Sequence, residues 1–141
     1  MVVILQTVPG TIQALKRQIG ERQNVFYTSN YPEALAFVSR NNLVNGRVVA
    51  IMSNYYPGQT VVGWQVARLI KLIRADAWCF LYTFNETDVN PFVDGTIFKG
   101  DPSLRLDVVL QLVEAGIDDP QRIPDLQTLY RTFLRIQRPN L

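Results

Sequence analysis

Short apolar runs alternate along this chain with segments in which apolar residues recur every three to four positions. The runs predict β-strands and the helical spacing predicts helices between them, a pattern typical of an α/β domain with a parallel sheet. The predicted strands are Val2–Gln6, Val25–Thr28, Arg47–Met52, Ala77–Tyr82 and Thr96–Lys99. The third strand is the most continuous apolar run, so we expect it to be central in the sheet and covered on both faces.

Residues that favour helix ends indicate where the connecting helices begin. Thr11 is expected to cap the first helix and Ser29 or Asn30 the second, because their side-chain oxygens accept backbone N–H groups. The third predicted helix extends from about Gly63 to Arg74. The residues at helical spacing on the apolar faces of these three helices are Ile12, Leu15, Ile19, Ala34, Ala36, Phe37, Val66, Leu69, Ile70 and Ile73.

The regular alternation stops after the fourth strand. The stretch from Phe84 to Asp94 is rich in asparagine and contains a proline, so it predicts a loop where a fourth helix would be shortened or replaced. Two more helices are predicted, one starting at Asp101 and one near Pro124. We therefore expect an α/β domain over residues 1–116 and an extra C-terminal helical extension over residues 117–141, packed on the same domain or at an interface.

The composition limits the chemistry that the chain can perform. At 141 residues and net charge +2, the chain has the size of one domain and lacks the basic excess of a dedicated nucleic-acid binder. It has no histidine, which excludes histidine-based triads and histidine metal ligands. Its one cysteine, Cys79, excludes an intramolecular disulfide and is expected to be a small buried hydrophobe. Without a signal-peptide pattern or a membrane-length apolar run, we expect a cytoplasmic protein with no membrane insertion.

Three motifs at the predicted strand ends resemble those of response-regulator receiver domains. They are Met52–Gly58 with its Pro-Gly turn, Leu81–Thr83, and Asp94–Lys99. The resemblance covers residues 1 to about 115. It implies a flavodoxin-like, doubly wound parallel sheet of five strands in the order 2-1-3-4-5, with the working site at the carboxyl ends of the strands.

The chain departs from the receiver pattern at its most diagnostic positions. The family's phosphoacceptor aspartate is Ser53 here, and the acids that hold Mg²⁺ after the first strand are replaced by Gln6 and Thr7. The family's two phosphoryl contacts survive as Thr83 and Lys99. The switch position that is usually aromatic is Thr96. The chain is therefore similar to the pseudo-receiver domains found in cyanobacterial clock and sensory proteins.

The resemblance implies a signalling module that acts through protein–protein interaction, without phosphorylation, enzymatic activity, cofactor or metal. The alternative is a small-ligand or anion sensor that uses Thr83 and Lys99 as polar contacts, with Tyr55, Tyr56 and Phe84 as walls. A hydrolase based on Ser53 would need a base, and Lys99 is the only evident one. Otherwise, Ser53 ends a buried strand and bonds to the loop backbone.

Two groups of residues are candidate interaction surfaces. Tyr55, Tyr56 and Trp64 surround the Pro-Gly loop, where they either pack internally or serve as anchors for a partner. The final predicted helix packs on its own sheet, docks a protein partner or forms a homodimer, or contacts a phosphate backbone, for which its arginines are a weak signal. Its candidate residues are Leu129, Arg131, Phe133 and Arg135. The carboxylates of Glu86, Asp88 and Asp94 match no metal signature and predict a solvated loop.

Overall fold

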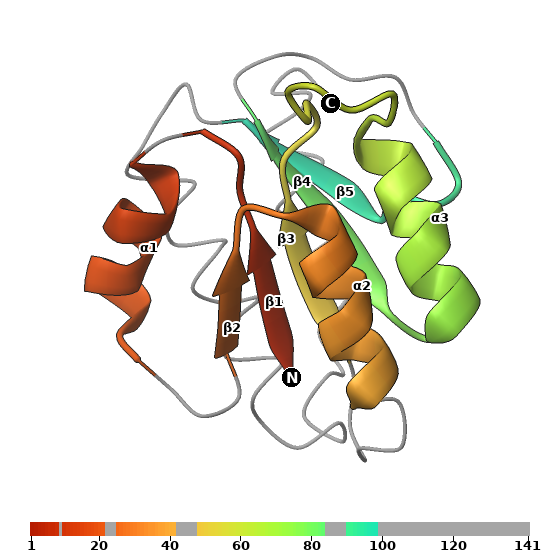
Figure 1. Cartoon of the computed structure of the whole chain (residues 1–141), viewed down its shortest axis with the longest axis horizontal. Coiled ribbons are helices and arrows are strands. Elements are labelled where there is room, and N and C mark those ends of the chain that lie inside the picture. Colours follow the sequence, from red (N-terminus) through yellow and green to blue (C-terminus); the bar gives the residue numbers. More distant parts are fainter. Residues whose placement is uncertain (9, 22–24, 42–47, 84–89, 99–141) are drawn as a thin grey trace, which may run out of the picture.

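Five parallel strands form one sheet in the order β2-β1-β3-β4-β5 (Figure 1). The computed structural model describes residues 1–8, 10–21, 25–41, 48–83 and 90–98. The strand bounds are β1 Val2–Leu5, β2 Val25–Thr28, β3 Val49–Met52, β4 Trp78–Thr83 and β5 Gly95–Phe98. This order confirms the predicted flavodoxin-like, doubly wound α/β fold.

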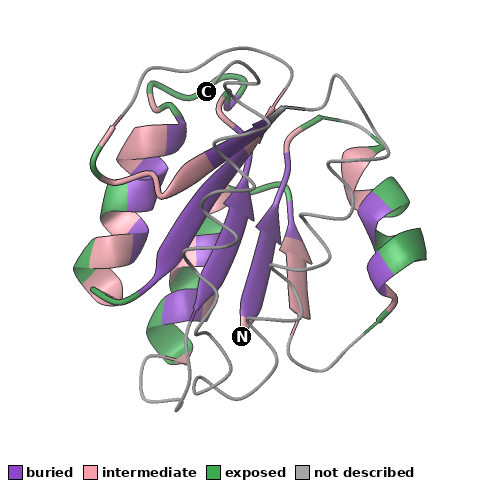
Figure 2. Ribbon diagram, turned by 180° about the vertical axis from the view of Figure 1, so that it is seen from behind, coloured by how far each residue is buried: buried purple, intermediate pink, exposed green. Residues whose placement is uncertain are grey.

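Three described helices cover the two faces of the sheet. Helix α1 (Thr11–Ile19) lies on one face, and α2 (Tyr31–Arg40) and α3 (Gly63–Ile73) lie on the other (Figure 1). β1 and β3 are buried along their whole length, as the purple strands in Figure 2 show. The prediction that the third strand is central and covered on both faces is confirmed, because side chains on both faces of β3 are buried.

The alternation of side chains along each strand produces two separate hydrophobic cores. On the α1 side, the buried core residues are Val2, Ile4, Leu15, Ile19, Val49, Ile51, Trp78, Phe80 and Ile97. On the α2 and α3 side they are Val3, Leu5, Ala34, Val38, Val48, Ala50, Met52, Tyr56, Val66, Ala67, Ile70, Ala77, Cys79 and Leu81. Consecutive residues of one strand therefore belong to different cores, which fixes the register of each strand strongly.

The structure corrects two details of the predicted helices. Thr11 does not cap α1, since Gly10 takes the N-cap position with φ of 87° and no side-chain bond. A left-handed turn is needed there, and glycine adopts it without strain. Ala36 is exposed on α2, and the buried residue that follows Ala34 one turn later is Val38. The cap of α2 is Asn30, as one of the two alternatives predicted, because its Oδ1 accepts the Glu33 N–H at 3.0 Å.

Several predictions fall outside the described residues. The Phe84–Asp94 loop is described only over residues 90–94, which form turns without a helix. The predicted C-terminal helices, the division at residue 116 and the candidates Lys99, Leu129, Arg131, Phe133 and Arg135 all lie outside the described residues. Among the helices that are described, none combines the length and hydrophobicity that crossing a bilayer requires.

Candidate functional site

The strand register brings the polar residues after β1 and β3 side by side. Leu5 pairs with Met52 in the parallel ladder, and the Ser53 N–H continues it by donating to the Leu5 carbonyl at 2.8 Å. Gln6 and Ser53 are therefore neighbours at the carboxyl edge, although they are 47 residues apart in sequence. This is the edge at which doubly wound sheets commonly place their working site.

Gln6, Thr7 and Ser53 form a closed hydrogen-bond network at this position, in which they bond to one another and to nearby backbone carbonyls. Ser53 Oγ accepts the Thr7 N–H at 2.8 Å and lies 3.5 Å from Gln6 Oε1, to which it donates. Gln6 Nε2 donates to the Ile51 carbonyl at 3.3 Å, and Thr7 Oγ1 donates to the Tyr55 carbonyl at 2.6 Å. Gln6 and Ser53 are only 1% and 4% exposed. Ser53 thus bonds across to Gln6 and Thr7 after β1, whereas the alternative to a catalytic role placed its bond on the backbone of its own loop.

The chemistry of this network is neutral. Its donors and acceptors are an amide, two hydroxyls and backbone groups. Among the described residues it includes no base that could activate Ser53 as a nucleophile, and the candidate base Lys99 lies outside them. A Mg²⁺ ion prefers charged oxygen ligands, which Gln6, Thr7 and Ser53 do not supply. No cluster of three acidic or cysteine side chains that could hold a metal occurs among the described residues. Gln6, Thr7 and Ser53 therefore do not fit the magnesium ion that receiver domains hold at this position.

The two threonines of the predicted site lie on neighbouring strands. Thr83 ends β4 in register with Phe98, and Thr96 pairs with Leu81. Thr96 is buried and Thr83 is half-buried. Thr83 lies one strand beyond Ser53, so β1, β3 and β4 all contribute polar residues to the same end of the sheet. The contact between Thr83 and Lys99 that an anion site would use falls outside the described residues.

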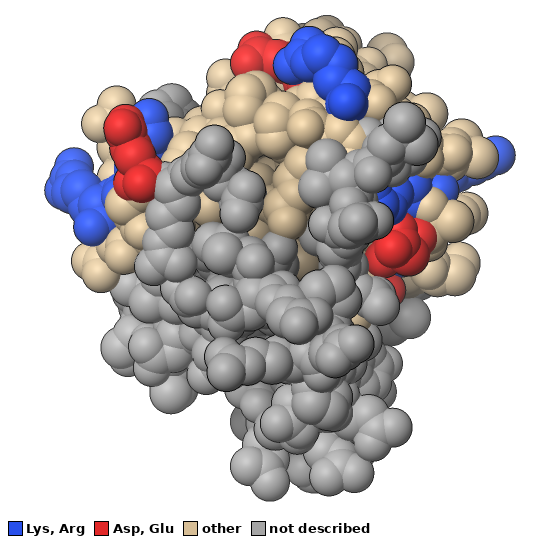
Figure 3. Space-filling model, turned by 90° about the horizontal axis from the view of Figure 1, so that it is seen from below, with Lys and Arg blue, Asp and Glu red and all other residues tan. Residues whose placement is uncertain are grey.

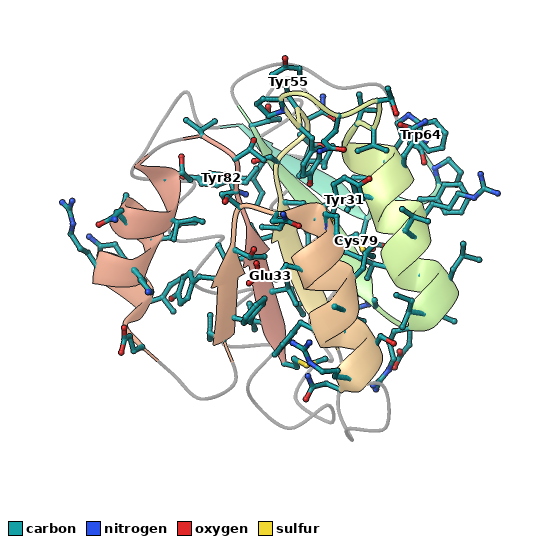
Figure 4. The ribbon with its side chains drawn as sticks, viewed as in Figure 1. Tyr31, Glu33, Tyr55, Trp64, Cys79 and Tyr82 are labelled. Atoms are coloured by element: carbon teal, nitrogen blue, oxygen red, sulfur yellow. The ribbon has the colours of Figure 1, made fainter. Side chains whose placement is uncertain are left out.

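The two adjacent tyrosines of the Pro-Gly loop have opposite environments. Tyr55 is 69% exposed and Tyr56 is 2% exposed. Tyr56 packs in the core, with its ring edge-on to Tyr31 at a centroid distance of 5.8 Å. Its hydroxyl has no hydrogen-bond partner among the described residues, and burial raises the Tyr56 pKa well above its usual range. Of the two alternatives that the sequence left open, internal packing holds for Tyr56, whereas Tyr55 is exposed and available to a partner (Figure 4).

Gly63 is a site residue that the sequence analysis missed. Its N–H donates to the Asn54 carbonyl at 2.9 Å, which holds the start of α3 against the end of β3. A Cβ at Gly63 would lie 2.5 Å from Leu81 Cδ2 and 3.1 Å from Asn54 Cα. A side chain at this position would force Leu81 and Asn54 to shift, whereas glycine allows the close approach. The available signal was a glycine where the third predicted helix begins, since glycine permits a close approach between backbone segments.

The predicted carboxylate Asp94 has a structural role at the other end of the sheet. Asp94 Oδ2 accepts the Cys79 N–H at 2.8 Å and forms an ion pair with Lys71 Nζ at 2.9 Å. It is therefore fixed between β4 and α3, and the expectation of a freely solvated side chain is wrong for this residue. Cys79 is buried, as predicted, and burial raises the pKa of its thiol to about 12. The thiol is accordingly protonated and unreactive at neutral pH.

The charges of the described residues form no extensive patch of one sign on the face shown in Figure 3, where blue and red side chains lie next to one another. Comparison with protein-family models, with curated proteins and with solved structures found no match. The function is therefore inferred from the fold and from the geometry of the strand ends.

Proposed function

We propose that this chain is a receiver-like signalling module that acts by binding a protein partner or a second copy of itself, without phosphorylation. The observation that carries this proposal is the closed Gln6–Thr7–Ser53 network at the carboxyl edge. Phosphoryl transfer needs a nucleophile, charge-neutralising cations and space for the phosphoryl oxygens. The network offers a neutral hydroxyl that is buried and already hydrogen-bonded.

Binding is supported by the surface beside this network. The Thr7 hydroxyl donates to the Tyr55 carbonyl, so the closed network holds the exposed Tyr55 in a fixed backbone position. A backbone that is already held in place has less entropy to lose when a partner binds beside it. The buried, protonated Cys79 is compatible with a reducing compartment, and we propose the cytoplasm as the location.

The first experiment tests phosphorylation directly. The full chain is incubated with acetyl phosphate and Mg²⁺, and its intact mass is measured beside that of Ser53→Ala. We expect no added phosphoryl group on either protein. A phosphoryl adduct on the wild type that is absent from Ser53→Ala would refute the proposal.

Native mass spectrometry on protein purified gently from its own cells tests the binding half of the proposal. We expect a stoichiometric complex with a protein partner, or a dimer. A monomer that carries a small-molecule adduct, lost in Lys99→Ala, would instead establish the ligand-sensor alternative and refute the docking function.

A further inference from the structure

Two aromatic side chains and an arginine stack together on the outer side of α3. They are separate from the Gln6–Thr7–Ser53 network. Trp64 lies in the first turn of α3 and stacks on Phe92, with ring centroids 6.3 Å apart and planes inclined by 17°. The Arg68 guanidinium lies over the same Phe92 ring, 5.8 Å from its centroid. We call Trp64, Arg68 and Phe92 the Trp64 stack. Its members are half-buried or exposed, so an aromatic and cationic surface faces the solvent.

The Trp64 stack is held in place by the chain around it. Trp64 and Arg68 are four residues apart on one helix and so share a face. Asn90 fixes Phe92, because its Oδ1 accepts the Phe92 N–H at 2.9 Å and its carbonyl accepts the Val93 N–H at 3.1 Å. A surface ordered before binding has little conformational entropy left to lose.

Arg68 differs from the other cations on and beside α3. Lys71 pairs with Asp94 at 2.9 Å, and Arg74 pairs with Asp76 at 2.8 Å. Within the described part of the chain, no carboxylate pairs with Arg68, which is exposed and lies over the face of Phe92. Arg68 can therefore pair with a carboxylate of a bound partner. A carboxylate there would form a charge-assisted, bidentate pair with the guanidinium.

Exposed apolar residues extend this surface toward the strand ends. Tyr55 and Val62, 69% and 39% exposed, face each other in an isolated antiparallel bridge immediately before α3. Figure 4 shows Trp64 projecting outward from α3, at the same end of the molecule as Tyr55. Tryptophan, tyrosine and arginine are the residue types that most often carry binding energy at protein interfaces.

We propose that the Trp64 stack, together with Tyr55 and Val62, binds a segment of a partner protein in which an acidic residue lies next to a large apolar or aromatic side chain. The acidic residue pairs with Arg68, and the apolar side chain packs against Trp64 and the Tyr55–Val62 bridge. This inference rests on the proposed docking function and adds to it the location of the surface and the chemistry of the partner.

The test uses a displayed library of random linear peptides, selected on the full-length chain. We expect the selected peptides to carry Asp or Glu beside an aromatic or aliphatic residue. Arg68→Glu should weaken their binding by about tenfold to a hundredfold, because a charged pair becomes a repulsive one. Selection on Arg68→Glu should in turn enrich Lys or Arg at the acidic position. Trp64→Ala should also weaken binding, with thermal unfolding measured to show that each variant is folded.

The matched control is Arg17→Glu, the same substitution at an exposed arginine of α1 on the opposite face of the sheet. It should leave the affinity of the selected peptides unchanged. Enriched peptides that are indifferent to Arg68 and Trp64, or an equal loss in Arg17→Glu, would overturn the inference. A concentration-dependent dimer abolished by Trp64→Ala would also overturn it, because the occupant would then be a second copy. These outcomes leave the phosphorylation test unaffected, so the two proposals fail separately.

Discussion

Replacing Ser53 by alanine removes the hydroxyl that joins the ends of β1 and β3. The Thr7 N–H loses its acceptor at 2.8 Å, and a partly buried donor is left unpaired. The second bond of this hydroxyl, to Gln6 Oε1 at 3.5 Å, is at the outer limit of hydrogen bonding and adds little. An unsatisfied buried donor costs about 1–3 kcal/mol, so we expect Ser53→Ala to lower the free energy of unfolding by about 1–2 kcal/mol.

Urea denaturation measures this loss. With a slope of about 1–3 kcal/mol per molar urea, the midpoint should fall by roughly 0.3–2 M while the slope stays unchanged. Hydrogen exchange gives a local readout, since the Thr7 amide should lose more protection than other amides of the same edge. The exposed Ser29 provides the control, because Ser29→Ala should change stability by less than about 0.5 kcal/mol. If Ser53→Ala behaves like this control and the Thr7 amide stays protected, the network does not hold the strand ends together.

Three further substitutions test the interior around this site. Tyr56→Phe removes a buried hydroxyl without a described partner, so the free energy of unfolding should increase by about 1 kcal/mol. A variant less stable than the wild type would show that the hydroxyl is paired. Gly63→Ala should destabilise by about 1–3 kcal/mol in chemical denaturation, because its Cβ would overlap Leu81 in the core; an unchanged midpoint would contradict the packing. Because the pKa of Cys79 is raised in the folded protein, the unfolded chain loses its thiol proton at a lower pH than the folded chain does. The free energy of unfolding should therefore fall as pH rises from about 9 toward 12, by up to about 1.4 kcal/mol per pH unit. Cys79→Ala should show a shallower decline over this range, and an equal decline would refute the assignment to Cys79.

The central strands could be predicted from the sequence because they are covered on both faces of the sheet. A strand covered on both faces needs apolar side chains at every position, and Val2–Leu5 and Val49–Met52 satisfy this condition without interruption. The order of the strands did not follow from this pattern. It was implied by the resemblance at the strand ends, and the structure confirms the order while the pseudo-receiver assignment stays a prediction.

The site was predictable only in part. Its positions at the strand ends followed from the sequence, since Gln6 and Thr7 lie at the end of the first predicted strand and Ser53 follows the third. Their bonds did not, because Ser53 and Thr7 are 46 residues apart and meet only through the register of two parallel strands. The Trp64 stack was similarly hidden, because Phe92 reaches α3 from a segment that the sequence predicts only as loop.

The sequence by itself determined the local features of this protein: the strands, the helix positions, the missing acids and the absence of histidine. These depend on side-chain type and short-range periodicity. The tertiary structure decided which polar groups became neighbours and which of two adjacent tyrosines entered the core. Tyr55 and Tyr56 are the same residue type, yet one is exposed and the other is buried. Their environments differ because the backbone at the end of β3, held by Thr7 and by the close approach of Gly63, turns one side chain outward and the other inward.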